Sequence, residues 1–327
     1  MTHRIAVAAL LAAWLGHAPG VLACTTCGCG LPGSGADIGS MAGAGAMFGG
    51  TDAWLLQTGV SVRDITGSFN ELGAWVDKPI GSSLQTLQIQ SALTWYPRQG
   101  LAFTLTLPGA LNRLDKARWA ALGKVAPLDV SDEETGDPIP QETRGGGWAD
   151  IALQGAWTIR DGEGYWPSLA LWGGLTLPTG RANGAAAEVT GLGLPTGQAG
   201  VAMLWSDLAW SQTLNLAWQQ PLTPLAAGPV PVFYLGQALL GTWQGQIEVI
   251  PDGWLGLGVT AFRAMSDLPG IAPSAGIQAK VKVTPAVEWR IAEGEGLRLA
   301  IGLDPDLGLS RNAMTDRTIG TVYYRSF

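Results

Sequence analysis

The residues whose types and spacing could do chemistry are three cysteines near the N-terminus. Cys24, Cys27 and Cys29 lie in the run CTTCGCG and are the only cysteines of the chain. Thiolates this close together bind soft cations such as Cu(I) or Zn(II), but three sulfurs need a further ligand to complete the shell. In an oxidising compartment the same spacing permits a disulfide with one thiol left over, and Cys24 is also a candidate for lipidation. We keep all three alternatives, and a soft metal here is the single cofactor that the sequence suggests.

Catalysis based on histidine is excluded by counting. The two histidines, His3 and His17, both lie in a predicted export signal and would be lost on its removal. The remaining chain then has no Ser-His or Cys-His pair and no imidazole ligand for a metal. The sequence therefore predicts a protein that is not an enzyme.

The N-terminal segment predicts export. Arg4 precedes an apolar stretch over residues 5–15, and Val21-Leu22-Ala23 is a suitable cleavage site. We expect a signal peptide over 1–23, a Cys- and Gly-rich periplasmic lead or plug over 24–52, and one further domain over 53–327. No later stretch approaches 18 uninterrupted apolar residues, which excludes a helical membrane protein.

The composition narrows the class of protein. The chain of 327 residues has 47 glycines and 15 tryptophans, and only 14% of its residues are charged. This composition is typical of tight strands with interfacial aromatic belts. The net charge of −7, without a basic cluster, argues against a nucleic-acid partner.

Alternation with period two over residues 151–159 and 168–177 predicts the strands that position the remaining polar side chains. One side of this hairpin is rich in Leu, Ile and Trp, and the other carries small and polar residues. Strands of roughly 10 residues are long enough to cross a bilayer when tilted. Similar runs recur at 54–63, 84–96, 101–107, 198–205, 209–218, 231–242, 254–263, 277–290, 297–303 and 317–327.

These runs predict an all-β protein, a transmembrane antiparallel up-and-down β-barrel of about 12 strands. Short connections alternate with long ones, as in outer-membrane barrels. The weak point is 231–253, where an extra hairpin would raise the count to 14. A soluble β-sandwich also alternates and is the competing fold.

The inward-facing charged, amide and aromatic side chains are the candidate site. Selectivity in a pore comes from the radius and charge of such residues. Trp172 is expected to act as a constriction or as an apolar contact for a solute. The alternation predicts that the lumen is lined by Arg63, Gln88, Gln90, Asp150, Gln154, Arg160, Trp172, Asn215, Lys280, Lys282, Glu288, Arg290 and Arg298.

The central hairpin resembles the outer-membrane family named after the meta-pathway of phenol degradation, which is related to barrels of the long-chain fatty-acid transporter type. The resemblance covers about 145–220 and rests on Gly147, Asp150, Ile151, the two LPTG runs 177–180 and 194–197, and Gly200. It implies a barrel with a role in passage of small, often apolar compounds, without naming one.

We therefore expect a channel in the bacterial outer membrane for passive passage of small, apolar or aromatic organic compounds. The alternative is a barrel-anchored component with a metal- or redox-linked role at the Cys cluster. The expected partners are outer-membrane lipid, a small organic solute and the barrel-assembly machinery. The last follows from Phe327, which ends an aromatic strand as in the recognition signal of such barrels.

Overall fold

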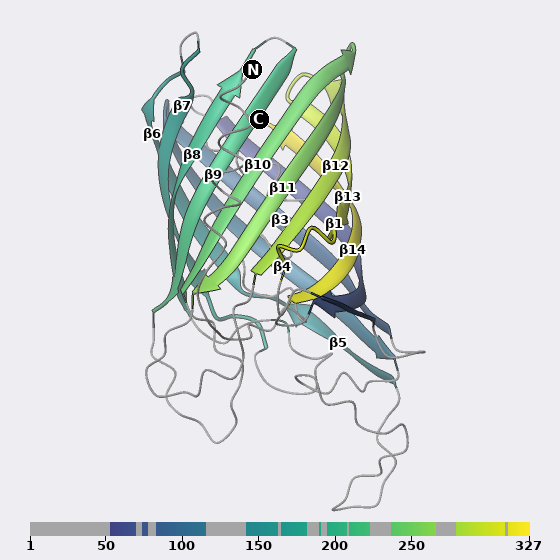
Figure 1. The fold of residues 1–327 in the computed structure, drawn as a ribbon. Coiled ribbons are helices and arrows are strands. Elements are labelled where there is room, and N and C mark those ends of the chain that lie inside the picture. Colours follow the sequence, from purple (N-terminus) through teal and green to yellow (C-terminus); the bar gives the residue numbers. More distant parts are fainter. Residues whose placement is uncertain are drawn as a thin grey trace, which may run out of the picture.

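The computed structural model describes residues 53–69, 74–77, 83–115, 142–162, 165–181, 190, 195–207, 209–222, 237–265, 279–310 and 313–327. Within these residues no helix is both long and apolar enough to span a membrane. The described chain forms tilted antiparallel strands that surround a common axis (Figure 1). The strands are β1 (Ala53–Phe69), β2 (Trp75–Asp77), β3 (Ser83–Arg98), β4 (Leu101–Asp115), β5 (Glu142–Trp148), β6 (Ile151–Arg160), β7 (Ser168–Leu177), β8 (Thr196–Ser206), β9 (Trp210–Pro221), β10 (Gln237–Ile250), β11 (Gly253–Met265), β12 (Ala279–Ala292), β13 (Glu295–Leu303) and β14 (Ala313–Ser326).

Twelve of these strands close into a barrel. Each pairs with its neighbour along the chain, and β14 pairs with β1 from Leu55↔Ser326 to Phe69↔Ala313. The closure extends to the C-terminal residue, because the Phe327 N–H donates to the Trp54 carbonyl at 2.8 Å. The two short strands add to the edges: β2 pairs with the end of β1, and β5 with the second half of β4.

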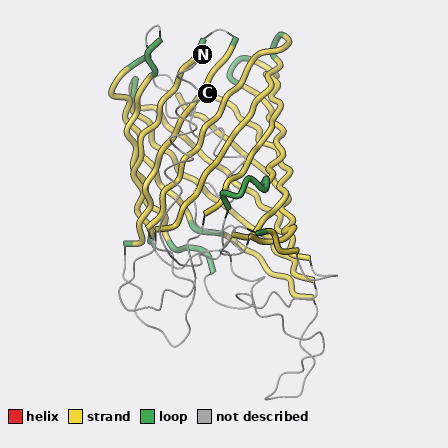
Figure 2. The backbone as a smooth tube through the Cα atoms, in the orientation of Figure 1, coloured by secondary structure: helices red, strands yellow, loops and turns green. Residues whose placement is uncertain are grey.

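The two ends of the barrel differ in their connections. Five short connections lie at one end, here called the turn end (Figures 1 and 2). Three of them are two-residue turns, and residues in the left-handed region close these: Gly100 (φ 74°), Asp252 (φ 62°) and Gly294 (φ 70°). The longer connections, including 116–141, 222–236 and 266–278, leave from the opposite end, the loop end. Short turns face the periplasm in outer-membrane barrels, and long loops face the exterior.

The outer face of the wall is apolar. Leu153 is 45% exposed, and its cross-strand neighbours Leu105 and Leu175 share its face. Near the turn end Trp95 stacks on Trp54 at 5.8 Å between ring centroids and lies 6.0 Å from Phe103. A closed sheet leaves no unpaired backbone edge, so an outer surface of this kind is suited to lipid, with the aromatic side chains at the interface. The chain therefore forms a transmembrane β-barrel rather than a β-sandwich.

The sequence predicted twelve wall strands, and several strand ends were wrong: β1 runs to Phe69 instead of 63, and β4 to Asp115 instead of 107. The eighth wall strand is β10 (Gln237–Ile250), which runs to Ile250, whereas the sequence placed its end at 242; the predicted residues 231–236 lie outside the described residues. The 14-residue strand runs unbroken to the turn at Pro251-Asp252, so there is no additional hairpin over its described part. The signal peptide and the lead over 24–52 lie outside the described residues.

A charge on the outer face tests the orientation of the wall. We expect Leu153→Arg to lower the stability of the folded barrel in lipid by about 2–4 kcal/mol, because the guanidinium would face hydrocarbon. Gln154→Arg is the matched control on the opposite face and should cost clearly less. Unfolding by urea in phospholipid vesicles, followed by the migration of unboiled protein in gels, measures both. Equal losses for the two variants would contradict the assigned faces.

Candidate functional site

The inner face of the wall is lined mainly by small side chains. Residues paired across neighbouring strands share a face, and the pairs Ala102↔Ala156 and Ala170↔Ala202 are all buried. A barrel of this size has a narrow interior that large side chains would fill. Alanine and glycine at these positions therefore take up less of that interior than larger side chains would.

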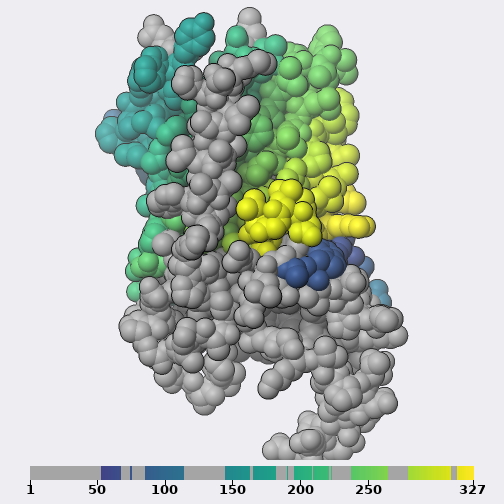
Figure 3. All heavy atoms as spheres, viewed as in Figure 1, coloured from purple at the N-terminus to yellow at the C-terminus, as the bar shows by residue number. Residues whose placement is uncertain are grey.

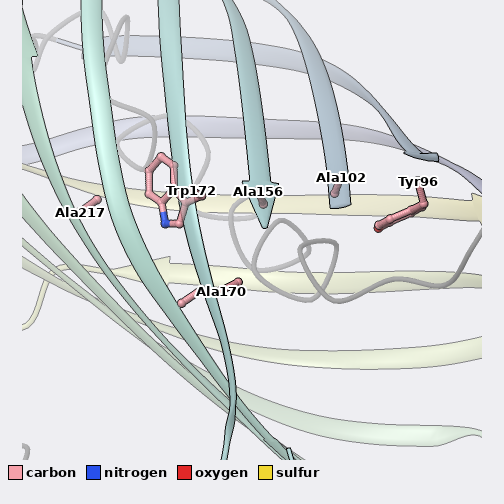
Figure 4. Close-up of a cluster of buried hydrophobic side chains, with 7 residues drawn as sticks. Tyr96, Ala102, Ala156, Ala170, Trp172 and Ala217 are labelled. Carbon is pink, nitrogen blue, oxygen red and sulfur yellow. The ribbon is translucent and has the colours of Figure 1, made fainter. Parts of the chain in front are cut away.

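One row of cross-strand neighbours on the inner face is almost entirely apolar, and we call it the apolar row. Because strands are tilted, such a row climbs around the wall from the turn end toward the loop end. Figure 4 shows part of it, with Ala217 on β9, Trp172 on β7, Ala156 on β6 and Ala102 on β4, and with Tyr96 packed beside the last. The paired residues of the row are Ala102, Ala156, Trp172, Gly200, Ala217, Leu240 and Phe262.

The indole of Trp172 lies along the wall and does not cross the bore. Its Nε1 donates to Asn215 Oδ1, two strands away, at 2.9 Å. The ring passes over Gly200 on the intervening strand, where a Cβ atom would come within 2.6 Å of Cε2 and Nε1. Glycine is thus the residue that lets the ring lie flat. Of the two expectations for Trp172, a constriction or an apolar contact for a solute, a ring that lies along the wall fits the apolar contact.

Five charged residues meet on the inner face near the loop end, and we call them the loop-end ion cluster. Asp316 Oδ2 accepts from Arg63 Nη2 at 2.8 Å and from Lys280 Nζ at 2.7 Å, while its Oδ1 accepts from Lys282 Nζ at 2.6 Å. Lys280 Nζ also donates to Asp304 Oδ2 at 2.9 Å. These contacts join β1, β12 and β14 with the connection that follows β13, across the seam where the barrel closes.

Asp304 reaches this cluster because the connection after β13 stays against the wall. The Val281 N–H donates to Ser310 Oγ at 3.2 Å, and the Asp316 N–H donates to Asp304 Oδ2 at 2.6 Å. Figure 3 shows yellow side chains of the C-terminal part of the chain at the surface in this region. The segment 304–310 therefore replaces β13 beside the end of β12.

A smaller polar group lies on the same side of the interior, closer to the turn end. Arg298 Nη1 is 3.6 Å from Glu288 Oε2, and the Tyr324 hydroxyl donates to Glu288 Oε1 at 2.8 Å. Together with the loop-end ion cluster it forms a polar stripe over β12–β14 and β1. The described interior is therefore polar along the closure seam and apolar along the row on the remaining strands.

Most of the predicted lumen residues share the inner face by register. Arg63, Trp172, Lys282 and Arg298 are buried there, and Gln88, Gln90, Gln154, Asn215, Lys280 and Glu288 are partly buried. Three other predicted residues lie elsewhere. A register shift after Thr158 carries Arg160 to an exposed position with its guanidinium 4.9 Å from the Trp166 ring centroid. Arg290 is exposed at the turn-end rim, 3.8 Å from Asp252.

Asp150 is the third of these residues. It takes part in a group of hydrogen bonds at the loop end, between β5 and β6. Its Oδ1 accepts from the Gly180 N–H at 2.8 Å. Thr179 Oγ1 donates to the Ala149 carbonyl at 2.9 Å and accepts from the Ile151 N–H at 3.0 Å. The first LPTG run thus fastens the end of β7 to the start of β6. Asp150 directly precedes β6, and its carboxylate stabilises this junction.

Sequence reasoning missed the acidic half of the ion cluster. Asp304 and Asp316 fall in 304–316, which was predicted to be an outer loop. A signal was present, because Lys280 and Lys282 share the inner face of one strand and two buried ammonium groups require counter-charges. Phe262 and Leu240 were missed for a different reason: apolar residues on an inner face were read as ordinary wall.

The predicted metal ligands Cys24, Cys27 and Cys29 lie outside the described residues, and the metal site remains a prediction. Among the residues that the structure describes, no group of three or more His, Cys, Asp or Glu side chains could hold a metal ion.

Comparisons with known proteins agree with the fold. No family model and no curated protein matches the chain. An outer-membrane channel from Pseudomonas putida F1 superposes with a TM-score of 0.62 and 14% identity, over 85% of this chain and 96% of that one. At this identity the likeness shows a shared fold, and together with the apolar outer face it places the chain in the bacterial outer membrane.

Two further solved structures superpose less closely on this chain. The P. putida toluene transporter TodX gives a TM-score of 0.41 at 11% identity, over 87% of this chain and 92% of that one. The translocator domain of the autotransporter NalP from Neisseria meningitidis gives 0.47 at 9% identity, over 92% and 99%.

Removing the central carboxylate should destabilise the barrel. We expect Asp316→Asn to cost about 3–5 kcal/mol in unfolding free energy, because three buried cations lose their shared counter-charge. Asp304→Asn is the control and should cost less, since that carboxylate pairs with one cation. Guanidinium unfolding in detergent micelles measures both variants. A loss for Asp316→Asn no larger than for Asp304→Asn would contradict this role.

A methyl group under the Trp172 ring should push the indole off the wall. We expect Gly200→Ala to cost about 1–3 kcal/mol by overpacking, because the added Cβ would meet the Leu216 carbonyl oxygen at 2.5 Å as well as the ring at 2.6 Å, and to reduce single-channel conductance as the ring moves toward the barrel axis. Gly173→Ala faces lipid beside Trp172, where a Cβ would meet only ordinary contacts, and it should leave conductance unchanged. Unaltered conductance in folded Gly200→Ala protein would contradict the flat placement.

Proposed function

We propose that this chain is a passive outer-membrane channel for small organic molecules with an apolar body. The observation that carries the proposal is the apolar row, an unbroken line of apolar residues from one end of the wall toward the other along an otherwise polar or small-residue inner face. Apolar solutes gain free energy against such a surface at roughly 25 cal/mol per Å² removed from water. The solved structure with the same fold is described as an outer-membrane channel, which supports transport over catalysis.

The side chains of the apolar row differ in size along the path that a solute would follow. Phe262 and Leu240 present larger side chains toward the loop end, and Ala217 and Gly200 present almost none in the middle. Trp172 then offers an aromatic face. Each of these points offers only a small apolar contact, and weak binding at several points in turn lets a solute enter and also leave.

A non-enzymatic role is also part of the proposal. After the predicted signal peptide the sequence has no histidine, and the charged groups of the loop-end ion cluster, like Glu288 and Arg298, form ion pairs with one another. Membership of the meta-pathway family of phenol degradation remains a proposal as well. Its support is the resemblance around the central hairpin.

Entry of a hydrophobic dye into intact cells tests this function. N-phenyl-1-naphthylamine is excluded by lipopolysaccharide and fluoresces on reaching apolar surroundings. We expect Gram-negative cells that produce the barrel to take up the dye faster than cells that produce Leu240→Asn at the same outer-membrane level. The loss should be about tenfold, because a side chain of similar size then presents an amide to the solute.

Thr242→Val is the matched control for this experiment. Thr242 lies on the inner face of β10, next to Leu240 on that face. Valine has the shape of threonine and adds no polarity. Dye entry should be at least as fast as in the wild type. If wild-type cells take up the dye no faster than cells without the protein, the proposed function is wrong.

A further inference from the structure

Polar residues form a continuous row on the outer face near the loop end, and we call it the outer polar row. The register places its members side by side on the neighbouring strands β5, β4, β3, β1 and β14. The paired residues of the row are Arg144, Arg113, Gln85, Asp64 and Arg317. One register step closer to the turn end the outer face is apolar, with Leu111, Val62 and Ile319. On these strands the outer face therefore changes from apolar to polar at a single level.

This level corresponds to the exterior boundary of the membrane. Trp54 is one of the stacked aromatic residues near the turn end, and Asp64 follows it on β1. The separation of about 10 residues, at about 3.3 Å each and a tilt of about 40°, spans roughly 25 Å along the membrane normal. The apolar band of an outer-membrane barrel is about this tall. Because the long connections leave from the loop end, the outer polar row lies beside the outer leaflet (Figure 1).

Two arginines of the row are direct neighbours. Arg113 on β4 and Arg144 on β5 are opposite each other in the register, and both are exposed. Opposite residues on antiparallel strands have Cβ atoms about 5 Å apart, so both guanidinium groups can reach the oxygens of one phosphate. A guanidinium presents several N–H donors in a planar fork that fits a phosphate. Both arginines also interact with other parts of the chain, but these contacts do not cover them.

An apolar surface adjoins the arginine pair on the side of the membrane. Leu111 is 56% exposed and Trp148 is 70% exposed, and the register places both on the outer face with Arg113 and Arg144. The Leu111 side chain also extends over Gly146, where an added Cβ would come within 2.6 Å of its Cδ2. Hydrocarbon chains that start from a headgroup at the arginine pair can therefore lie on Leu111 and Trp148.

We propose that Arg113 and Arg144 bind a phosphate group of lipopolysaccharide in the outer leaflet. Lipid A, its membrane anchor, is a phosphorylated sugar with several acyl chains, so it offers an anion at the headgroup and hydrocarbon below. The arginine pair binds the phosphate, and Leu111 and Trp148 contact acyl chains. Arg317 lies in the same row directly beside Asp64, whose carboxylate disfavours an anion there. Binding of lipid A at this place does not depend on the proposed channel function.

Titration with lipid A tests the proposal. The purified full-length protein is kept in detergent micelles with EDTA, which removes divalent cations that could link lipid A to carboxylates. Native mass spectra then count the lipid molecules that each barrel retains as the lipid concentration rises. We expect the wild type to bind phosphorylated lipid A at least about tenfold more tightly than the same lipid without phosphate, because the charged hydrogen bonds are then lost.

Variants assign the binding to the arginine pair. Arg113→Gln and Arg144→Gln should each weaken binding of lipid A about tenfold, which corresponds to the loss of one charged contact. Arg113→Lys should retain part of the affinity, because an ammonium binds phosphate as a point charge. Arg317→Gln is the matched control, since it removes an exposed guanidinium from the same row, and it should leave the affinity unchanged. The shift in migration between unboiled and boiled samples shows that each variant is folded.

Three outcomes would overturn the proposal. Equal affinity for lipid A with and without phosphate means that the arginine pair does not recognise the headgroup. Undiminished binding in both Arg113→Gln and Arg144→Gln, or an equal loss in Arg317→Gln, means that lipid A binds elsewhere on the barrel. Displacement of lipid A by inorganic phosphate at the same concentration means that the pair is a general anion site and not a lipid site.

Discussion

The structure depends on one constraint, which is that no backbone hydrogen-bonding group can be left unpaired in lipid. The pairing of β14 with β1 meets it, and hydrogen bonds between Trp54 and Phe327 extend that pairing to the last residue. Closure has a consequence for side chains, because it brings Arg63 on the first strand against Asp316 on the last. The ion cluster and the backbone seam therefore stabilise the same junction.

Closure also determines what the interior can hold. A tilted, closed sheet of twelve strands leaves little room, so a bore exists only where inner-face residues are small. The many alanines and Gly200 meet that requirement, and Gly200 does so in a specific way, since it lets the Trp172 ring lie against the wall. Charges collect on the opposite strands, where they neutralise one another. Apolar and polar surfaces thus face each other across one bore.

Period-two alternation predicted the fold class and the face of almost every wall residue, because the pleat alone decides which way a side chain points. Alternation does not report where a strand begins. Nor does it report where a strand ends: β10 runs to Ile250, beyond the predicted end at 242, and Asp304 and Asp316 were assigned to a connection between strands. Nor does it report which residues meet: Arg63 and Asp316 become neighbours only when the first and last strands pair. Arg160 left the predicted face through a register shift, which the sequence does not mark.

The motif that carried the family resemblance and the surface that carries the proposed function are different parts of the molecule. Hydrogen bonds at the junction of β6 and β7 involve Thr179, Gly180 and Asp150. These residues therefore have a structural reason to occur together. A resemblance at such residues indicates a shared architecture. One barrel architecture can serve unrelated solutes, so the resemblance does not identify the solute. The chemistry of the solute must come from the inner face. There the apolar row lies on the strands from β4 to β11, and the ion pairs lie along the closure seam.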